Sequence, residues 1–97
     1  MKLRFTAKAV GQIDLALDFI GERSPQGAAG LRRRISSAVV LLQEHPRAGQ
    51  TTSRQGVRRL SLSPFPYVIF YRIYEEEVVI LRFRHGARSP LSRSAQS

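Results

Sequence analysis

The alternation of apolar and polar residues is most regular between Pro66 and Arg88. Two runs rich in Tyr, Val, Ile, Phe and Leu flank the acidic triplet Glu75–Glu77 in this stretch. Both runs have the length and the content of β-branched and aromatic residues that are typical of strands. The pattern therefore predicts a β-hairpin with the acidic triplet at its turn.

Alternation also assigns the residues of the second run to two faces, because successive strand side chains point to opposite sides. One face is wholly apolar, so we expect the rest of the chain to cover it; its residues are Val79, Leu81 and Phe83. His85 ends the strand on this covered face. The other face starts apolar and ends with two guanidinium groups, so we predict an open surface; it carries Val78, Ile80, Arg82 and Arg84.

The first half of the chain predicts a short strand and a pair of helices. Residues 3–5 alternate and indicate an edge strand. From Ala7 to about Glu22 apolar residues recur at helical spacing. Ser24 followed by Pro25 is a signal for the start of a second helix, which Pro46 ends. The short link predicts an antiparallel helix hairpin.

Between the helices and the hairpin we expect one further strand. The polar segment 46–56 is a loop, and residues 57–62 form a strand that places Arg58 on one face with Leu60 and Leu62. The predicted fold is α+β, in the order β-α-α-β-β-β. An N-terminal strand precedes an antiparallel helix hairpin, which packs on one face of a mainly antiparallel four-stranded sheet. We expect a single domain over residues 1–90 and a flexible tail over residues 91–97.

The composition changes this picture by adding a strong positive charge. The chain has 16 Lys and Arg against 7 Asp and Glu, a net charge of +9, and only Lys2 and Lys8 are lysines. This excess predicts a polyanionic partner, and the planar fork of arginine suits phosphate or carboxylate. The absence of cysteine excludes disulfides and thiolate metal sites. No apolar run suits a signal sequence or a membrane span, so we expect a soluble cytoplasmic protein without metal or cofactor.

Four stretches together resemble the RelE/ParE superfamily of toxins from type II toxin-antitoxin systems. They cover about residues 5–90 and read AVGQIDLALDFI, SPQGAAGLRRRISSAVVLLQEHPRAG, GVRRLSLSPFPYVIFYR and VVILRFRHGAR. The resemblance implies a small basic toxin in a hetero-oligomer with a cognate antitoxin, whose C-terminal segment wraps around it. It also implies that the complex contacts operator DNA only indirectly, through the antitoxin.

The superfamily has two functional branches. RelE-like members resemble ribosome-dependent mRNA endonucleases, whereas ParE-like members resemble inhibitors of DNA gyrase that need no active site. Cleavage of RNA by its own 2′-OH needs a proton acceptor, an acid, and cations around the phosphate. The candidates for these roles are His85, Arg58, Arg82 and Arg84. RelE-like members commonly add central lysines and a reactive Tyr or His near the C-terminus, which this chain lacks. We therefore expect a ParE-like gyrase inhibitor, with the mRNA endonuclease as the alternative.

The predicted partner-binding surface lies on the open sheet face. Arg58, Arg82 and Arg84 share this face if their strands are neighbours, and the full predicted set is Arg58, Val78, Ile80, Arg82, Arg84 and Arg88. His85 falls on the covered face, which favours a structural role over catalysis. The net charge of +9 leaves a third hypothesis open, a plain nucleic-acid-binding domain.

Overall fold

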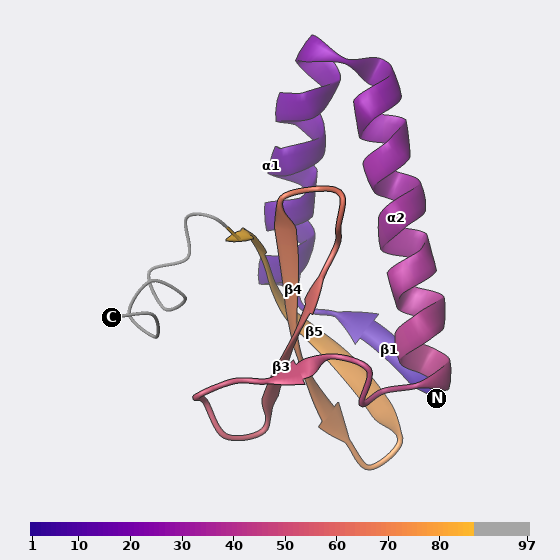
Figure 1. Ribbon diagram of the computed structural model, residues 1–97, viewed down its shortest axis with the longest axis vertical. Helices are drawn as coiled ribbons and strands as arrows, with labels where there is room; N and C mark the ends of the chain where they lie inside the picture. Colours follow the sequence, from indigo (N-terminus) through magenta and orange to yellow (C-terminus); the bar gives the residue numbers. More distant parts are fainter. Residues whose placement is uncertain (87–97) are drawn as a thin grey trace.

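A helix hairpin stands against a strongly twisted sheet in the computed structural model, which describes residues 1–86 (Figure 1). The predicted tail 91–97, the domain boundary at residue 90, and Arg88 lie outside the described residues. In chain order the elements are β1 (Lys2–Phe5), α1 (Ala7–Arg23), α2 (Pro25–Glu44), β2 (Gln50–Thr51), β3 (Val57–Ser61), β4 (Tyr67–Tyr74) and β5 (Glu77–His85).

Two hydroxyl side chains set the ends of the helices. The Thr6 Oγ1 accepts a hydrogen bond from the Ala9 N–H (3.1 Å) and donates one to the Leu81 carbonyl (3.0 Å), which ties the start of α1 to β5. The Ser24 Oγ accepts a hydrogen bond from the Gly27 N–H (2.9 Å), and Pro25 follows as the first residue of α2. Because one residue ends α1 and caps α2, the link is as short as predicted.

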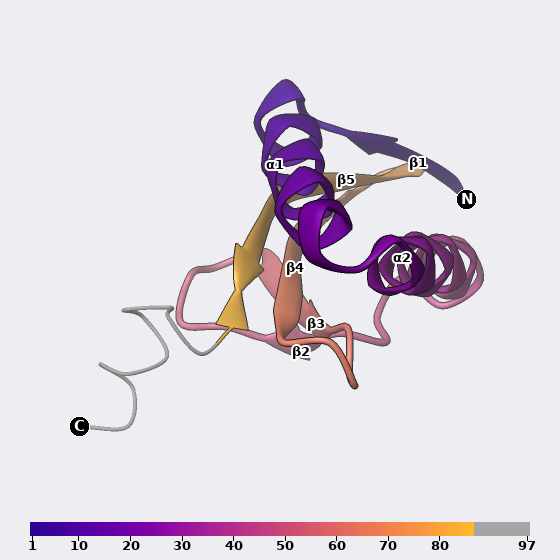
Figure 2. The ribbon, with the colours of Figure 1, turned by 90° about the horizontal axis from the view of Figure 1, so that it is seen from above.

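The sheet has five strands in the order β1-β5-β4-β3-β2. β1 pairs parallel with β5, and every other neighbouring pair is antiparallel. Seen nearly end-on in Figure 2, the helices lie next to each other, with β4 below α1 and β3 and β2 further down. Side chains from both helices and from one sheet face form a single core cluster. The predicted α+β architecture is confirmed, and the additional strand is the two-residue β2 inside the predicted loop.

β5 departs from strict alternation at Leu81. In the pairing with β4, Phe70 lies opposite Arg82, whereas the next residue, Tyr71, lies opposite Ile80. Leu81 therefore has no partner on β4, which is the arrangement of a β-bulge. A residue inserted in this way reverses the assignment of faces for everything beyond it.

The bulge overturns the predicted faces of this strand. Val78 and Ile80 are both 0% exposed and belong to the core beneath the helices, so their assignment to the open face is wrong. Phe83 faces the same core from beyond the bulge. The prediction that Val79 and Leu81 share the covered face with Phe83 is also wrong, since both lie on the opposite side.

Tyr71 fastens the connection between α2 and β2 to the sheet. Its side chain is 0% exposed, and its hydroxyl donates a hydrogen bond to the Pro46 carbonyl (2.7 Å). The same oxygen accepts a hydrogen bond from the Gly49 N–H (2.8 Å). Burial raises the pKa of Tyr71 above its ordinary value, although the hydrogen bond from Gly49 and the charge of Arg58 oppose this shift. Tyr71 therefore stays a neutral, structural hydroxyl at neutral pH.

Candidate arginine-rich binding site

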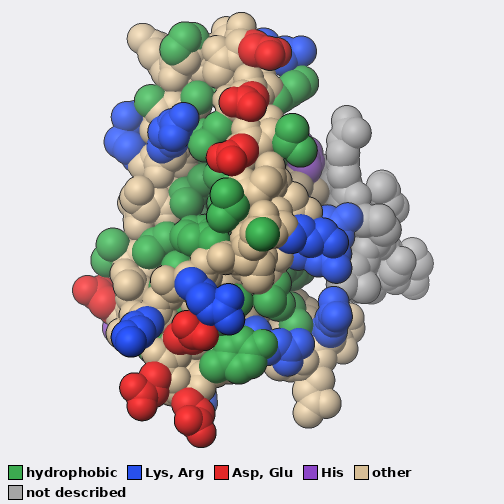
Figure 3. Space-filling view, turned by 180° about the vertical axis from the view of Figure 1, so that it is seen from behind, with side chains coloured by type: hydrophobic (Ala, Val, Ile, Leu, Met, Phe, Trp, Pro, Cys, Tyr) green, Lys and Arg blue, Asp and Glu red, His purple; other side chains and the backbone are tan. Residues whose placement is uncertain are grey.

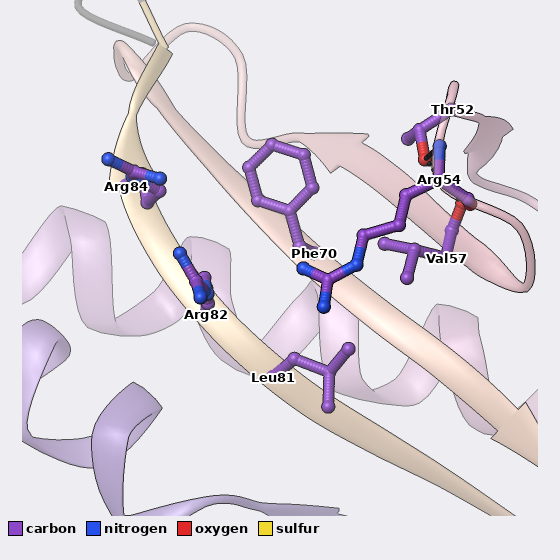
Figure 4. A pocket seen from close by; sticks show the side chains of 7 residues that line it. All are labelled: Thr52, Arg54, Val57, Phe70, Leu81, Arg82 and Arg84. Atoms are coloured by element: carbon purple, nitrogen blue, oxygen red, sulfur yellow. Dashed lines mark hydrogen bonds between the residues drawn. The ribbon is translucent and has the colours of Figure 1, made fainter. Parts of the chain in front are cut away.

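A pocket opens on the sheet face that points away from the helices. Its volume is about 70 Å³, and we call it the arginine pocket; its lining residues are Thr52, Arg54, Val57, Phe70, Leu81, Arg82 and Arg84. Figure 4 shows Arg54 reaching from the β2–β3 loop across Val57, so that its guanidinium group ends near Phe70 and Leu81. Arg82 and Arg84 project from β5 on the far side of Phe70. The pocket thus has an apolar floor and a cationic rim.

The strand register places two more arginines on this face. Arg59 lies opposite Phe70, and Arg72 lies opposite Val57, both of which line the pocket. The Arg59 Nε atom is buried and has no hydrogen-bond partner within residues 1–86. Three valines support these long side chains from below and are nearly fully buried: Val57, Val68 and Val79. Arginine stems commonly cover apolar surface in this way while the charged ends stay accessible.

The positive charge of this face is not neutralised by carboxylates of the described residues. Within residues 1–86 there is one ion pair, in which the Arg4 Nε lies 3.1 Å from the Glu77 Oε1. It lies at the β1 edge of the sheet, away from the arginine pocket. Seen from behind in Figure 3, acidic side chains lie in a row along the upper half of the molecule and again at its lower end. A surface of one sign with apolar walls strengthens the field that an anionic partner meets.

Arg58 is not part of the pocket. It lies opposite Tyr71, on the covered face, and its guanidinium group donates hydrogen bonds to the carbonyls of Gly49 (2.8 Å) and Arg47 (3.4 Å). The prediction that Arg58 shares the open face with Arg82 and Arg84 is therefore wrong. Alternation had already grouped Arg58 with residues of the core, and this signal should have assigned it to the helix side.

Arg54, Arg59 and Arg72 were missed by the sequence reasoning. For Arg59 a signal was present, because it neighbours Arg58 on the strand and must point to the other face. Arg72 can be placed on this face only when the pairing of β3 with β4 is known, and the sequence alone does not show this pairing. Arg54 lies in a loop, and only the folded path of this loop brings its side chain over the sheet.

His85 lies on the covered face, as alternation beyond the bulge requires. Its ring packs edge-on against Tyr67, with 5.5 Å between ring centroids, and Tyr67 in turn stacks on Phe83 at 4.8 Å. The His85 Nδ1 is buried without a hydrogen-bond partner in the described part of the chain. Its structural role is thus aromatic packing, and the imidazole does not line the arginine pocket.

The lining of the pocket supports binding and charge stabilisation. Arginine stays protonated at any physiological pH, and its guanidinium group donates hydrogen bonds without accepting them. Among residues 1–86, no His, Lys, Asp, Glu or Tyr lines the pocket. The described residues also contain no cluster of side chains suited to hold a metal ion. Over the same residues, no helix has the length and apolar character needed to cross a membrane.

A helix hairpin packs on one face of the mainly antiparallel sheet and arginines gather on the other, an arrangement that agrees with the RelE/ParE superfamily of toxins. The family described as "ParE toxin of type II toxin-antitoxin system, parDE" matches residues 3–90. The chain belongs to this family. Its partner is accordingly an antitoxin protein.

Individual relatives agree with this assignment. The Y4kP protein of Sinorhizobium fredii is 34% identical over 85 residues, 88% of each chain. Toxin RelE2 of Caulobacter vibrioides is 34% identical over 84 residues, 87% of this chain and 93% of the relative. A structure of the chromosomal ParDE toxin-antitoxin system from P. aeruginosa has a TM-score of 0.78 at 30% identity, covering 88% of this chain and 95% of that one. The isolated E. coli RelE toxin shares the fold, with a TM-score of 0.65 at 18% identity and coverage of 98% and 94%.

Proposed function

We propose that this toxin acts in the cytoplasm as a ParE-like inhibitor, which binds DNA gyrase through the arginine pocket and the arginines beside it. The cognate antitoxin neutralises the toxin by covering the same surface with an acidic, amphipathic segment, and the two form a hetero-oligomer. The contact surface comprises Arg54, Arg59, Phe70, Arg82 and Arg84. Arg88 joins it as a proposed contact that lies outside the described residues.

The lack of proton-transfer groups in the pocket carries this proposal. Cleavage of RNA requires a group that takes the 2′-OH proton and a group that protonates the leaving oxygen. Within residues 1–86, His85 packs on the opposite face against Tyr67, and Tyr71 is fully buried with its hydroxyl held by Pro46 and Gly49. The arginines stabilise negative charge but move no proton at neutral pH. This site is suited to holding an acidic surface.

The alternative is a RelE-like, ribosome-dependent mRNA endonuclease. Its support is the 34% identity to toxin RelE2 and the guanidinium groups of Arg82 and Arg84, which suit a phosphate under attack. In that case His85 would have to leave its packing against Tyr67 to reach the substrate. Arg58, the remaining candidate for this chemistry, already donates hydrogen bonds to two backbone carbonyls.

A side-by-side assay separates these functions. Toxin freed from its antitoxin is added to a gyrase supercoiling reaction and, separately, to a translation extract in which message integrity is followed. We expect supercoiling to stop while the message stays intact, and we expect His85→Ala to inhibit gyrase as wild type does. Cleaved message that is lost in the His85→Ala variant would refute the proposal and establish the endonuclease.

Contact with DNA is proposed to be indirect, through the antitoxin. Toxin alone should then bind a short duplex weakly at physiological salt, and the complex should bind operator DNA with sequence preference. A tight complex of toxin with bare DNA, with an affinity that falls steeply as salt rises, would favour the plain nucleic-acid-binding domain.

A further inference from the structure

The outer face of α1 carries a stripe of exposed residues that is not part of the arginine pocket. Its residues are spaced 3, 4, 4 and 3 positions apart, all are exposed, and they are Lys8, Gly11, Leu15, Phe19 and Glu22. Leu15 is 72% exposed and Phe19 is 57% exposed, which makes them the most exposed of the large apolar side chains in the described residues. This spacing keeps the five residues on one side of the helix.

The stripe is symmetric about Leu15. Gly11 and Phe19 lie four residues on either side of it, and Lys8 and Glu22 lie seven residues on either side. If two copies of α1 lie antiparallel with a twofold axis at Leu15, each Leu15 meets its counterpart. Each Phe19 then lies over Gly11 of the other copy, and each Lys8 lies opposite Glu22. The end charges are opposite in sign, so the stripe is complementary to itself.

The local structure supports this register. A Cβ atom built on Gly11 has no neighbour within 4 Å, so the space above this residue is open to the ring of another copy. The Phe19 ring is held in place by Arg23, whose guanidinium carbon lies 3.9 Å from the ring centroid. The same guanidinium group donates a hydrogen bond to the Phe19 carbonyl (3.0 Å). Phe19 is therefore ordered before any partner arrives, which lowers the entropy lost on association.

The distribution of charge favours this face for contact between two copies. The protein carries a net charge of +9, so most approaches of one copy to another are repulsive. The outer side of α1 differs from the rest of the surface, because the exposed carboxylates of Asp14, Asp18 and Glu22 offset the charges of Lys8 and Arg23, so this face carries no excess of positive charge. Figure 3 shows this acidic row with apolar side chains beside it.

We infer that this toxin self-associates into a twofold symmetric dimer by antiparallel packing of α1 against α1, centred on Leu15. α1 packs on the covered side of the sheet, so the dimer leaves both arginine pockets accessible. One helix pair is a small interface, so we expect a dimer that forms and dissociates with concentration. The inference does not depend on whether gyrase or mRNA is the target.

Sedimentation velocity of the full-length toxin, from about 1 μM to about 500 μM, measures this association. Wild type should shift from monomer to dimer within that range. Leu15→Glu should raise the dissociation constant by about tenfold or more, because two carboxylates would face each other at the twofold axis. Val40→Glu is the matched control, since Val40 is 53% exposed on α2, and it should leave the constant unchanged. Circular dichroism of each variant verifies that it folds.

Charge reversal tests the register itself. Lys8→Glu and Glu22→Lys should each weaken the dimer by about three- to tenfold, since each places like charges at both ends of the helix pair. The double variant Lys8→Glu/Glu22→Lys should restore wild-type affinity. A monomer at every concentration, a dimer that ignores Leu15→Glu, or a double variant weaker than both single variants would overturn the inference.

Discussion

The two hydrogen bonds of the buried Tyr71 hydroxyl give the most direct test of how this fold is held together. Tyr71→Phe removes only the oxygen and keeps the ring in the core. The Pro46 carbonyl and the Gly49 N–H then lose the partners that lie 2.7 and 2.8 Å away. A buried polar group left without a partner costs about 1–3 kcal/mol. We expect the substitution to lower the free energy of unfolding by about 2–4 kcal/mol, a large share of the usual total of about 5–15 kcal/mol.

Urea unfolding followed by circular dichroism measures this loss. The midpoint should fall by about 2 M while the slope stays unchanged, because the surface exposed on unfolding is the same. Tyr74→Phe is the matched control, since Tyr74 is 48% exposed at the end of β4, and it should change stability by less than about 0.5 kcal/mol. Equal effects of the two substitutions would refute the role assigned to the Tyr71 hydroxyl.

Three further predictions follow from the same region. Gly49→Ala should destabilise the protein by about 1–3 kcal/mol in urea unfolding, because the added Cβ would lie 2.6 Å from the Tyr71 hydroxyl and 2.7 Å from the Arg59 carbonyl. Gly21→Ala on α1 is the control, and it should stabilise the protein by about 0.5–1 kcal/mol. Burial holds the pKa of Tyr71 in the folded protein above its unfolded value of 10.0. Wild type should therefore keep the stability contributed by the neutral hydroxyl below about pH 10 and lose it as the pH rises toward the folded pKa. Tyr71→Phe should not show this loss when its unfolding is measured between about pH 8 and 11. Arg58→Met should lower stability by about 1–2 kcal/mol, yet leave gyrase inhibition unchanged in a supercoiling assay, because Arg58 bonds backbone carbonyls on the covered face.

The helix hairpin was predictable because its determinants are local. Thr6, Ser24 and Pro25 act on residues within a few positions of themselves, and apolar spacing alone identifies the buried side of each helix. The hairpin of β4 and β5 was predictable for the same reason, since its acidic turn lies between two apolar runs. β2 was not, because two polar residues, Gln50 and Thr51, carry no strand pattern of their own.

The candidate site was harder to predict because it depends on pairing between strands. Leu81 looks like any apolar strand residue, and only its missing partner on β4 reveals the bulge. The inserted residue breaks the strict alternation, so Val78 and Ile80 before it share the core face with Phe83 beyond it, while Arg82 lies on the open face. Arg82 and Arg84 were predicted on the open face, and they line the pocket there.

A supercoiling assay with arginine variants tests the central claim, that the open sheet face holds the target. Arg82→Gln/Arg84→Gln removes two charges from the rim of the arginine pocket, and Arg32→Gln/Arg33→Gln removes two from the exposed side of α2 as a control of equal charge. We predict that the first variant folds normally and inhibits gyrase at least about tenfold less strongly than wild type, while the second inhibits like wild type. Full inhibition by the Arg82→Gln/Arg84→Gln variant would contradict the account.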